Sequence, residues 1–159
     1  MNQNAKKTDR DLLAYQGRIF QGLLEEIVEC CQARTFYLCR LFSLPRAELR
    51  CLMLLAGQRY LTAKDLARRL EVVKSRVTKI VDGLRRKGLV ETVADPEDAR
   101  VKLIRLTALG RDKAGEIERF NQGLHQRLLA DIPPAERQQV LGTLVSLRSA
   151  MEAIKRELV

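Results

Sequence analysis

One apolar stripe near the middle of the chain constrains its fold more than any other feature. Between residues 73 and 84 the large aliphatic side chains fall at positions i, i+4, i+7, i+8 and i+11, which places them on one face of an α-helix. They are Val73, Val77, Ile80, Val81 and Leu84. Arg85, Arg86 and Lys87 follow, where positive charge suits the carboxyl end of a helix, and Gly88 fits just beyond that end. The stripe therefore predicts an amphipathic helix with one buried face and one exposed face.

The segments on either side of this helix predict a compact motif. Residues 89–93 and 101–106 are rich in β-branched and aliphatic residues, and the pair Asp95-Pro96 between them is typical of a turn. Before the helix, a Thr-x-x-Asp sequence at 62–65 resembles a capping box, with Asp in place of the usual Glu or Gln. Together these features predict a helix-turn-helix followed by a β-hairpin wing.

Long helical stretches flank this central part. Apolar residues recur at helical spacing from Asp11 to Phe42, and a Ser-Leu-Pro sequence at 43–45 then breaks the pattern. Thr107 can cap the next long helix, and the last helix begins near Ala135 with near-heptad apolar spacing. We expect a mainly α fold with a small β-hairpin, a winged helix-turn-helix flanked by terminal dimerisation helices. The expected domains are 1–44, 45–107 and 108–159.

The terminal stripes also bear on assembly. In a chain of 159 residues they have too little partner surface unless they pack on each other and on a second copy. This favours a homodimer held by the two ends. The alternative, in which both stripes close a single monomeric core, stays open at this level.

Composition excludes several classes of protein. The chain has one histidine, and its four cysteines show no CxxC spacing, which argues against zinc sites of the usual kinds. The sequence contains neither GxxxxGK[ST] nor GxGxxG, and no nucleophile elbow lies near His125. We therefore expect no enzyme, no metal and no cofactor. The polar residues 1–11 and the lack of a long uncharged apolar stretch predict a cytoplasmic protein without a membrane span.

Charge points to a polyanionic partner, either nucleic acid or an acidic membrane surface. The chain has 29 Lys and Arg against 20 Asp and Glu, a net charge of +9. Residues 62–111 alone hold 13 basic and 7 acidic residues, so less than a third of the chain carries +6 of that charge. This concentration argues against the alternative in which the basic helix face is merely solvated.

The predicted helix after residue 73 suits reading of a DNA major groove. In a helix-turn-helix the base contacts come from the N-terminal part of the second helix. Arginine and lysine can donate to guanine O6 and N7, while serine and threonine can reach phosphates or base edges. The DNA contacts that we expect from this helix are Lys74, Ser75, Arg76, Thr78, Lys79 and Arg86.

The predicted wing offers a second contact. Arg100 ends the turn between the two β-runs, and Lys102 follows on the second run. A projecting arginine can enter a narrow A·T-rich minor groove, where the negative potential is strongest. We expect Asp98 to hold Arg100, or a basic side chain of the preceding helix, in a fixed rotamer. The alternative is an ordinary charged turn.

Three motifs stand at fixed spacing in the sequence: LRRKGLV at 84–90, DPEDAR at 95–100 and LTALG at 106–110. Together they make the sequence similar to the MarR family of winged-helix regulators. The resemblance implies a homodimeric DNA-binding transcriptional regulator, usually a repressor, that binds a pseudo-palindromic operator. It also implies recognition-helix contacts from Ser75, Arg76, Thr78 and Lys79, and a minor-groove contact from Arg100 braced by Asp98. Val73, where the family often has Ser or Thr, and the helix-loosening Gly83 depart from the pattern.

The same family often responds to phenolic ligands, metals or oxidants. The single histidine argues against metal sensing. A small molecule could bind between the dimer helices and the winged domain, although aromatic residues in such places are more often core; the candidate lining is Phe36, Tyr37, Phe42 and Arg50. Oxidant sensing by Cys30 and Cys31 is a further hypothesis, against which buried, inert thiols are favoured. A non-specific architectural nucleic-acid binder is the remaining alternative.

Overall fold

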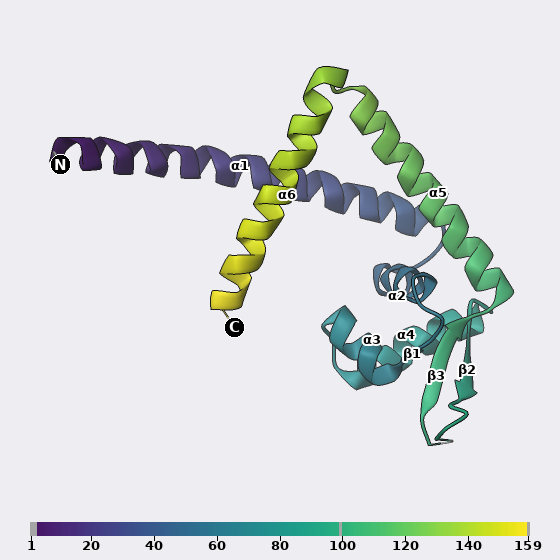
Figure 1. Ribbon diagram of the computed structural model, residues 1–159. Helices are drawn as coiled ribbons and strands as arrows, with labels where there is room; N and C mark the ends of the chain where they lie inside the picture. The colour runs from purple at the N-terminus through teal and green to yellow at the C-terminus, as the bar shows by residue number, and fades with distance from the viewer. Residues whose placement is uncertain (1–2, 99, 159) are drawn as a thin grey trace. The chain divides into compact units, whose positions relative to one another are not determined.

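The computed structural model describes residues 3–98 and 100–158. The mainly helical fold with a small β-sheet is confirmed (Figure 1). In chain order the elements are α1 (Gln3–Leu41), α2 (Arg46–Ala56), β1 (Leu61–Thr62), α3 (Ala63–Leu70), α4 (Lys74–Arg86), β2 (Val90–Ala94), β3 (Lys102–Leu106), α5 (Ala108–Ala130) and α6 (Pro134–Glu157).

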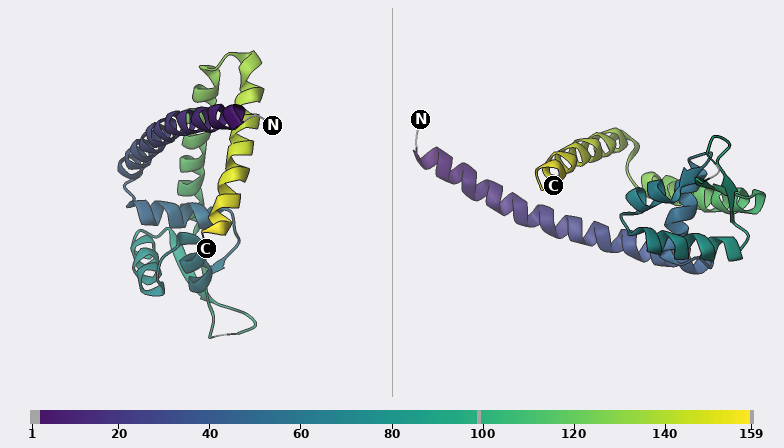
Figure 2. Two further views of the ribbon diagram at one scale, coloured as in Figure 1. Left: turned by 90° about the vertical axis from the view of Figure 1, so that its left-hand side faces the viewer. Right: turned by 90° about the horizontal axis from the view of Figure 1, so that it is seen from below.

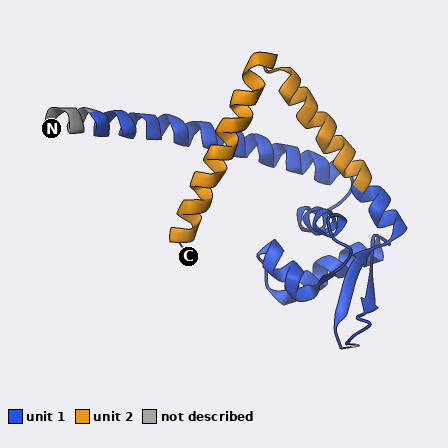
Figure 3. Ribbon diagram, in the orientation of Figure 1, with its two compact units in different colours: residues 1–114 blue, residues 115–159 orange. Residues whose placement is uncertain are grey.

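The chain divides into two compact units (Figure 3). The first covers residues 1–114, and the second covers residues 115–159. The boundary falls inside α5, so the first unit holds everything from α1 to the opening turns of α5. In the first unit α1 runs as one long helix without interruption (Figure 2), as the absence of proline between its ends predicts.

The core of the first unit lies among α2, α3, α4 and the sheet. The predicted stripe of α4 is buried at Val77, Ile80, Val81 and Leu84. Val73 departs from the prediction, because its side chain is 69% exposed. It occupies the N-cap position, ahead of the first helical turn, and so it lies outside the buried face.

The wing is part of a three-stranded antiparallel sheet in the order β1-β3-β2. The predicted hairpin is present as β2 and β3, with Val90 opposite Leu106. The two-residue strand β1 adds to the other edge of β3, where Leu61 pairs with Ile104. The sequence did not predict β1 because two residues are too few to show an alternating pattern.

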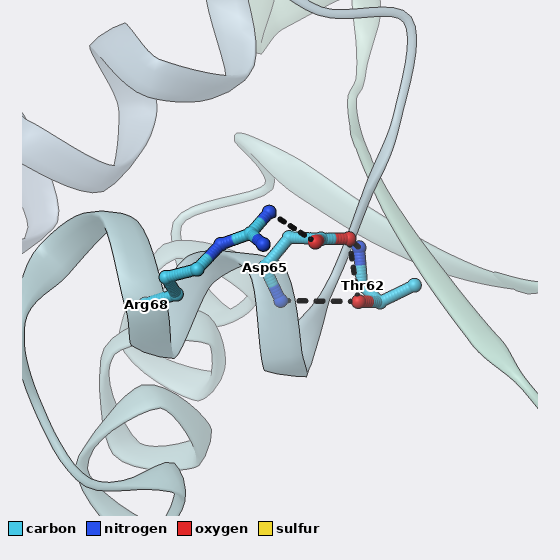
Figure 4. A network of polar contacts seen from close by, with 3 residues as sticks. All are labelled: Thr62, Asp65 and Arg68. Carbon is cyan, nitrogen blue, oxygen red and sulfur yellow. Dashed lines mark hydrogen bonds and ion pairs between the residues drawn. The ribbon is translucent and has the colours of Figure 1, made fainter.

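The predicted capping box at the start of α3 is confirmed (Figure 4). The amide N–H of Asp65 donates to Thr62 Oγ1 at 3.1 Å, and the Thr62 hydroxyl donates to Asp65 Oδ2 at 2.7 Å. Arg68 Nη2 lies 3.2 Å from the other carboxylate oxygen. The hydrogen bond from the Thr62 side chain is the main cause that lowers the pKa of Asp65 below its ordinary value of 3.8, and the charge of Arg68 adds to it.

A network of backbone contacts joins the end of α4 to the start of α5. The Thr107 hydroxyl donates to the Gly88 carbonyl at 2.6 Å and accepts from the Gly110 amide at 3.0 Å. The carbonyl of Leu89 accepts from the Thr107 amide at 3.1 Å and leaves no room for a Cβ atom at Gly110. Gly88 has φ +70°, a left-handed conformation that favours glycine. The predicted cap at Thr107 is thus present. A side chain at Gly110 would collide with the Leu89 carbonyl, and a side chain at Gly88 would be strained in the left-handed conformation.

The second unit consists of the rest of α5 and α6. Arg137 of α6 donates from Nε to the Ile132 carbonyl at 2.9 Å and from Nη2 to the Ala130 carbonyl at 3.3 Å, which satisfies acceptors at the end of α5. Taken by itself, α6 exposes a row of large apolar side chains: Leu141, Leu144, Val145, Met151 and Ile154. In the part of the chain that the structure describes, no helix is long and apolar enough to cross a membrane.

Replacement of Asp65 by Asn tests the capping box through pH. A carboxyl whose pKa is lowered by folding stabilises the fold above its unfolded pKa, and this stabilisation disappears as the pH falls through the folded pKa. We therefore expect Asp65→Asn to lower the free energy of unfolding at pH 7 and the difference from wild type to shrink below about pH 3.8. Urea unfolding between pH 7 and pH 2.5 measures this difference. A difference that stays constant down to pH 2.5 would contradict the assignment.

Replacement of Gly110 by Ala tests the close approach between α5 and Leu89. Because the new Cβ atom would meet a backbone carbonyl, which cannot swing away as a side chain can, we expect the variant to lose about 1–3 kcal/mol of unfolding free energy. Gly57→Ala is the control, since its φ is −82° and the nearest atom to its added methyl group lies at 4.0 Å. Equal stability of the two variants in thermal or urea unfolding would rule out the steric explanation.

Candidate nucleic-acid interface

The exposed face of α4 carries the side chains that the sequence predicted. All six predicted contact residues of this helix are exposed: Lys74, Ser75, Arg76, Thr78, Lys79 and Arg86. Five of them lie in the first two turns. Arg86 is the last residue of α4, about 18 Å along the axis from Lys74. Among the predicted contacts, the structure therefore separates one basic cluster at the N-terminal end of the helix from Arg86, which lies beside Arg85 at the other end.

The N-terminus of α4 has no side-chain cap. Val73 occupies the N-cap position without a side-chain hydrogen bond, and the first turn contains no acidic residue. The first amide groups of a helix carry partial positive charge and point outward along the axis. Lys74 and Arg76 add full positive charges at the same end. This end of α4 consequently favours an anionic ligand such as a phosphate.

A cleft of about 520 Å³ runs between α2 and α4. Ser75, Arg76 and Lys79 line it from α4. Ala47 and Glu48 line it from α2. The structure thus brings three of the predicted contact residues to one surface, beside α2, for which the sequence predicts no part in the interface.

Glu48 holds α2 close to the second half of α4. Its carboxylate accepts a hydrogen bond from Lys87 Nζ, and its side chain is only 12% exposed. The same carboxylate lies over Gly83, where an added Cβ would collide with it. Gly83, which the sequence alone presents as a weakness in the helix, thus leaves room beside α4 for the Glu48 carboxylate.

Arg50 lies at the turn of the helix-turn-helix. Its guanidinium donates from Nη2 to the Arg69 carbonyl at 3.1 Å and from Nη1 to the Leu70 carbonyl at 3.3 Å. These are terminal carbonyls of α3, which the helix itself leaves without partners. Glu71 follows in a left-handed conformation with φ 57°. The structure gives Arg50, predicted as part of a ligand pocket, a definite role in holding this turn.

The other candidate ligand residues lie on or after α1. Phe36 and Tyr37 are 65% and 55% exposed, so the alternative of a core role does not hold for them in the single chain. Phe42 is half-buried, and Lys113 Nζ lies 5.5 Å from the centre of its ring. Whether these residues form a ligand pocket with Arg50 stays a prediction.

The cysteines differ in their surroundings. Cys30 and Cys31 are exposed on α1, so the prediction that they are core thiols is wrong for the single chain. That prediction followed from their apolar neighbours in sequence, which in this chain are exposed as well. Cys51 is buried, and desolvation, with a smaller effect of the Glu48 charge, raises its pKa to about 12.

The turn at the tip of the wing is ordered by its own carboxylates. Asp95 Oδ1 accepts from the Glu97 amide, and Asp98 Oδ1 accepts from the Arg100 amide, both at 2.9 Å. The prediction for Asp98 is corrected in its detail, because the contact described reaches the backbone of Arg100 and not its guanidinium. Arg100 and Lys102 are both exposed. Asp98 therefore fixes the chain from which the Arg100 side chain projects.

This arrangement defines a winged helix-turn-helix protein, and comparison with known proteins agrees. Residues 42–101 match the model of the MarR family. The HTH-type transcriptional regulator YdgJ of Bacillus subtilis is 28% identical over 120 residues, which cover 76% of this chain and 72% of YdgJ. The transcriptional regulator AdcR of Streptococcus pneumoniae is 42% identical over 65 residues, which cover 41% of this chain and 44% of AdcR.

Solved structures show the same fold. MepR, a transcription regulator of the multidrug efflux pump MepA of Staphylococcus aureus, matches with a TM-score of 0.73 and 21% identity, over 81% of this chain and 96% of that one. Together with the family match, this confirms the resemblance seen in the sequence motifs. Residues 42–101 carry a winged helix-turn-helix that matches the MarR family, and these matches support a DNA-binding transcriptional regulator.

The role of Asp98 can be tested with two variants. Because its oxygen serves as an acceptor for the Arg100 amide, Asp98→Asn retains an acceptor while Asp98→Ala loses it. We expect Asp98→Ala to weaken DNA binding and Asp98→Asn to stay close to wild type, as measured by fluorescence anisotropy with a labelled duplex. If the Asn variant is as weak as the Ala variant, the negative charge matters and not the turn.

Proposed function

We propose that the protein is a homodimeric repressor that reads a pseudo-palindromic operator and releases it in response to a small molecule. The observation that carries this proposal is the outward presentation of Ser75, Arg76, Thr78 and Lys79 from the first two turns of a helix whose opposite face is buried. Side chains in that position can reach base edges when the helix enters the major groove.

In this proposal residues 1–44 and 108–159 form the dimerisation region, and residues 45–107 form the DNA-binding domain. Exposed apolar side chains on α1 and on α6 support it, because leaving such faces in contact with water costs free energy that burial against a second copy recovers. Twofold symmetry would place two α4 helices in successive major grooves, about one helical turn of DNA apart.

The wing has a separate role in the proposal. Arg100 reaches into the adjacent minor groove from the tip that Asp95 and Asp98 order, and Lys102 contacts the backbone. A narrow A·T-rich minor groove attracts such an arginine most strongly. Arg86, at the far end of α4, adds a phosphate contact.

For the effector, only a class of ligand and a candidate set of lining residues are proposed. Phe36, Tyr37 and Phe42, with Arg50, remain the candidate lining for an aromatic ligand. The alternative effector is an oxidant acting on Cys30 and Cys31, and the exposure of both thiols on α1 supports their accessibility to it in the single chain.

The double variant Arg76→Ala/Lys79→Ala tests the proposed function. We expect it to lose the sequence-specific gel shift on an operator selected from genomic fragments, because two cationic groups leave the reading face. Arg10→Ala/Arg18→Ala is the control, since it removes the same charge from exposed positions of α1. Analytical ultracentrifugation checks that both variants keep the wild-type assembly.

Unchanged operator binding by the double variant would contradict the assignment of Arg76 and Lys79 to the DNA-binding face of α4. Competition with bulk DNA separates the proposal from a non-specific architectural binder, which the net charge of +9 would also suit. A sequence-specific repressor binds its operator about a thousand times or more as tightly as it binds bulk DNA. If bulk DNA displaces the protein from the operator as well as the same amount of unlabelled operator does, the architectural role is favoured.

A further inference from the structure

A second, smaller cleft lies beside the N-terminal end of α4. Its volume is about 240 Å³, and none of its lining residues is acidic. Three of them are arginines from two different helices, Arg46 and Arg50 of α2 and Arg76 of α4. The remaining lining residues are apolar: Ala47, Leu70, Val72 and Ile80.

The local structure explains why three arginines line one cleft. Arg46 is the first residue of α2, and Arg50 lies one turn later on the same face. Arg76 is the third residue of α4, which packs against α2. Like charges four residues apart in a helix destabilise it, and a third cation brought close by tertiary packing adds to that cost. The cluster therefore favours a bound anion.

The Arg50 side chain is held in place by two hydrogen bonds to backbone carbonyls. Two of its five N–H groups are held by the Arg69 and Leu70 carbonyls, which fixes the plane of the guanidinium. The other N–H groups of Arg50 are left to donate elsewhere. Planar guanidinium groups suit phosphate oxygens because they offer parallel donors.

This cleft continues into the larger one that Ser75 and Lys79 line. Ala47, Arg76 and Ile80 line both clefts. Arg76 therefore stands between the face proposed to read bases and the arginine cluster. An anion in the smaller cleft would lie at the edge of the interface, where the backbone of a duplex runs when a helix fills its major groove.

We propose that Arg46, Arg50 and Arg76 form a phosphate clamp that holds one phosphodiester of the DNA backbone beside each half-site. The inference rests on the proposed function and changes it in one respect: it adds α2 to the DNA-binding surface and moves Arg76 from base reading to the backbone. Sequence reading is then left to Ser75, Thr78 and Lys79. A contact to phosphate positions the protein on DNA without carrying sequence information.

Salt dependence tests the clamp. Neutralisation of one phosphate contributes about 0.9 to the slope of log K against log salt. We expect Arg46→Gln and Arg76→Gln each to weaken binding by the same factor on the operator and on a scrambled duplex. Because both arginines serve one phosphate, the double variant should lose no more than about 0.9 of slope per half-site.

The matched control is Arg10→Gln, which removes one charge from an exposed position of α1. Arg50 is left unchanged, since its loss would also leave carbonyls of α3 without partners. The clamp is overturned if Arg46→Gln binds as Arg10→Gln does, if its loss appears on the operator alone, or if the double variant loses about 1.8 of slope per half-site, twice the value for one phosphate.

A second measurement locates the phosphate. Duplexes that carry a single neutral methylphosphonate at successive positions should reveal one position in each half-site where wild-type binding falls and binding by Arg46→Gln does not. Wild-type protein that binds the operator but shows no such position overturns the clamp alone. Wild-type protein that prefers no operator over scrambled DNA overturns the proposed function instead.

Discussion

The burial of one face of α4 determines what the other face can do. Val77, Ile80, Val81 and Leu84 are removed from water, and each contributes roughly 1.5–3 kcal/mol of hydrophobic stabilisation. Because the helix has 3.6 residues per turn, this burial fixes the rotation of α4 about its own axis. Ser75 and Lys79, on the opposite face of the helix, then point to solvent, and no other contact is needed to direct them there. The interface is thus a consequence of how the core packs.

Helix α2 controls where α4 lies. Glu48 contacts α4 through Lys87 and through the space that Gly83 leaves, while Arg50 contacts the end of α3 just before the turn. Helix α2 therefore contacts the carboxyl end of α4 through Glu48 and the end of α3, just before α4 begins, through Arg50. A buried or half-buried ion pair is weak evidence for stability, but it specifies one geometry among several. We interpret α2 as the element that sets the spacing and angle of the reading face.

The wing is positioned by a different set of contacts. Thr107 links the Gly88 carbonyl to the first turn of α5, and Gly110 lets that turn approach Leu89. The motifs at 84–90 and 106–110 thus meet in space, which gives a physical reason for their fixed glycines. The third motif, at 95–100, orders the tip through Asp95 and Asp98. Two of the motifs therefore hold the base of the wing together, and the third orders its tip.

The sequence by itself determined the features that depend on near neighbours along the chain. The stripe of α4, the capping box of Thr62 and Asp65 and the cap at Thr107 are all visible there, because helical periodicity and capping involve residues a few positions apart. The exposed cations of α4 followed from the same periodicity.

Only the tertiary structure decided the features that join distant segments. The pairing of β1 with β3 brings together strands some forty residues apart, and two residues carry no pattern that would announce it. The hydrogen bonds of Arg50 to two carbonyls of α3 could not be predicted from the sequence, because these partners lie 19 and 20 positions away. That Arg46 and Arg76 line one cleft could not be predicted for the same reason, since contacts between remote segments depend on the shape of the whole core and not on local spacing.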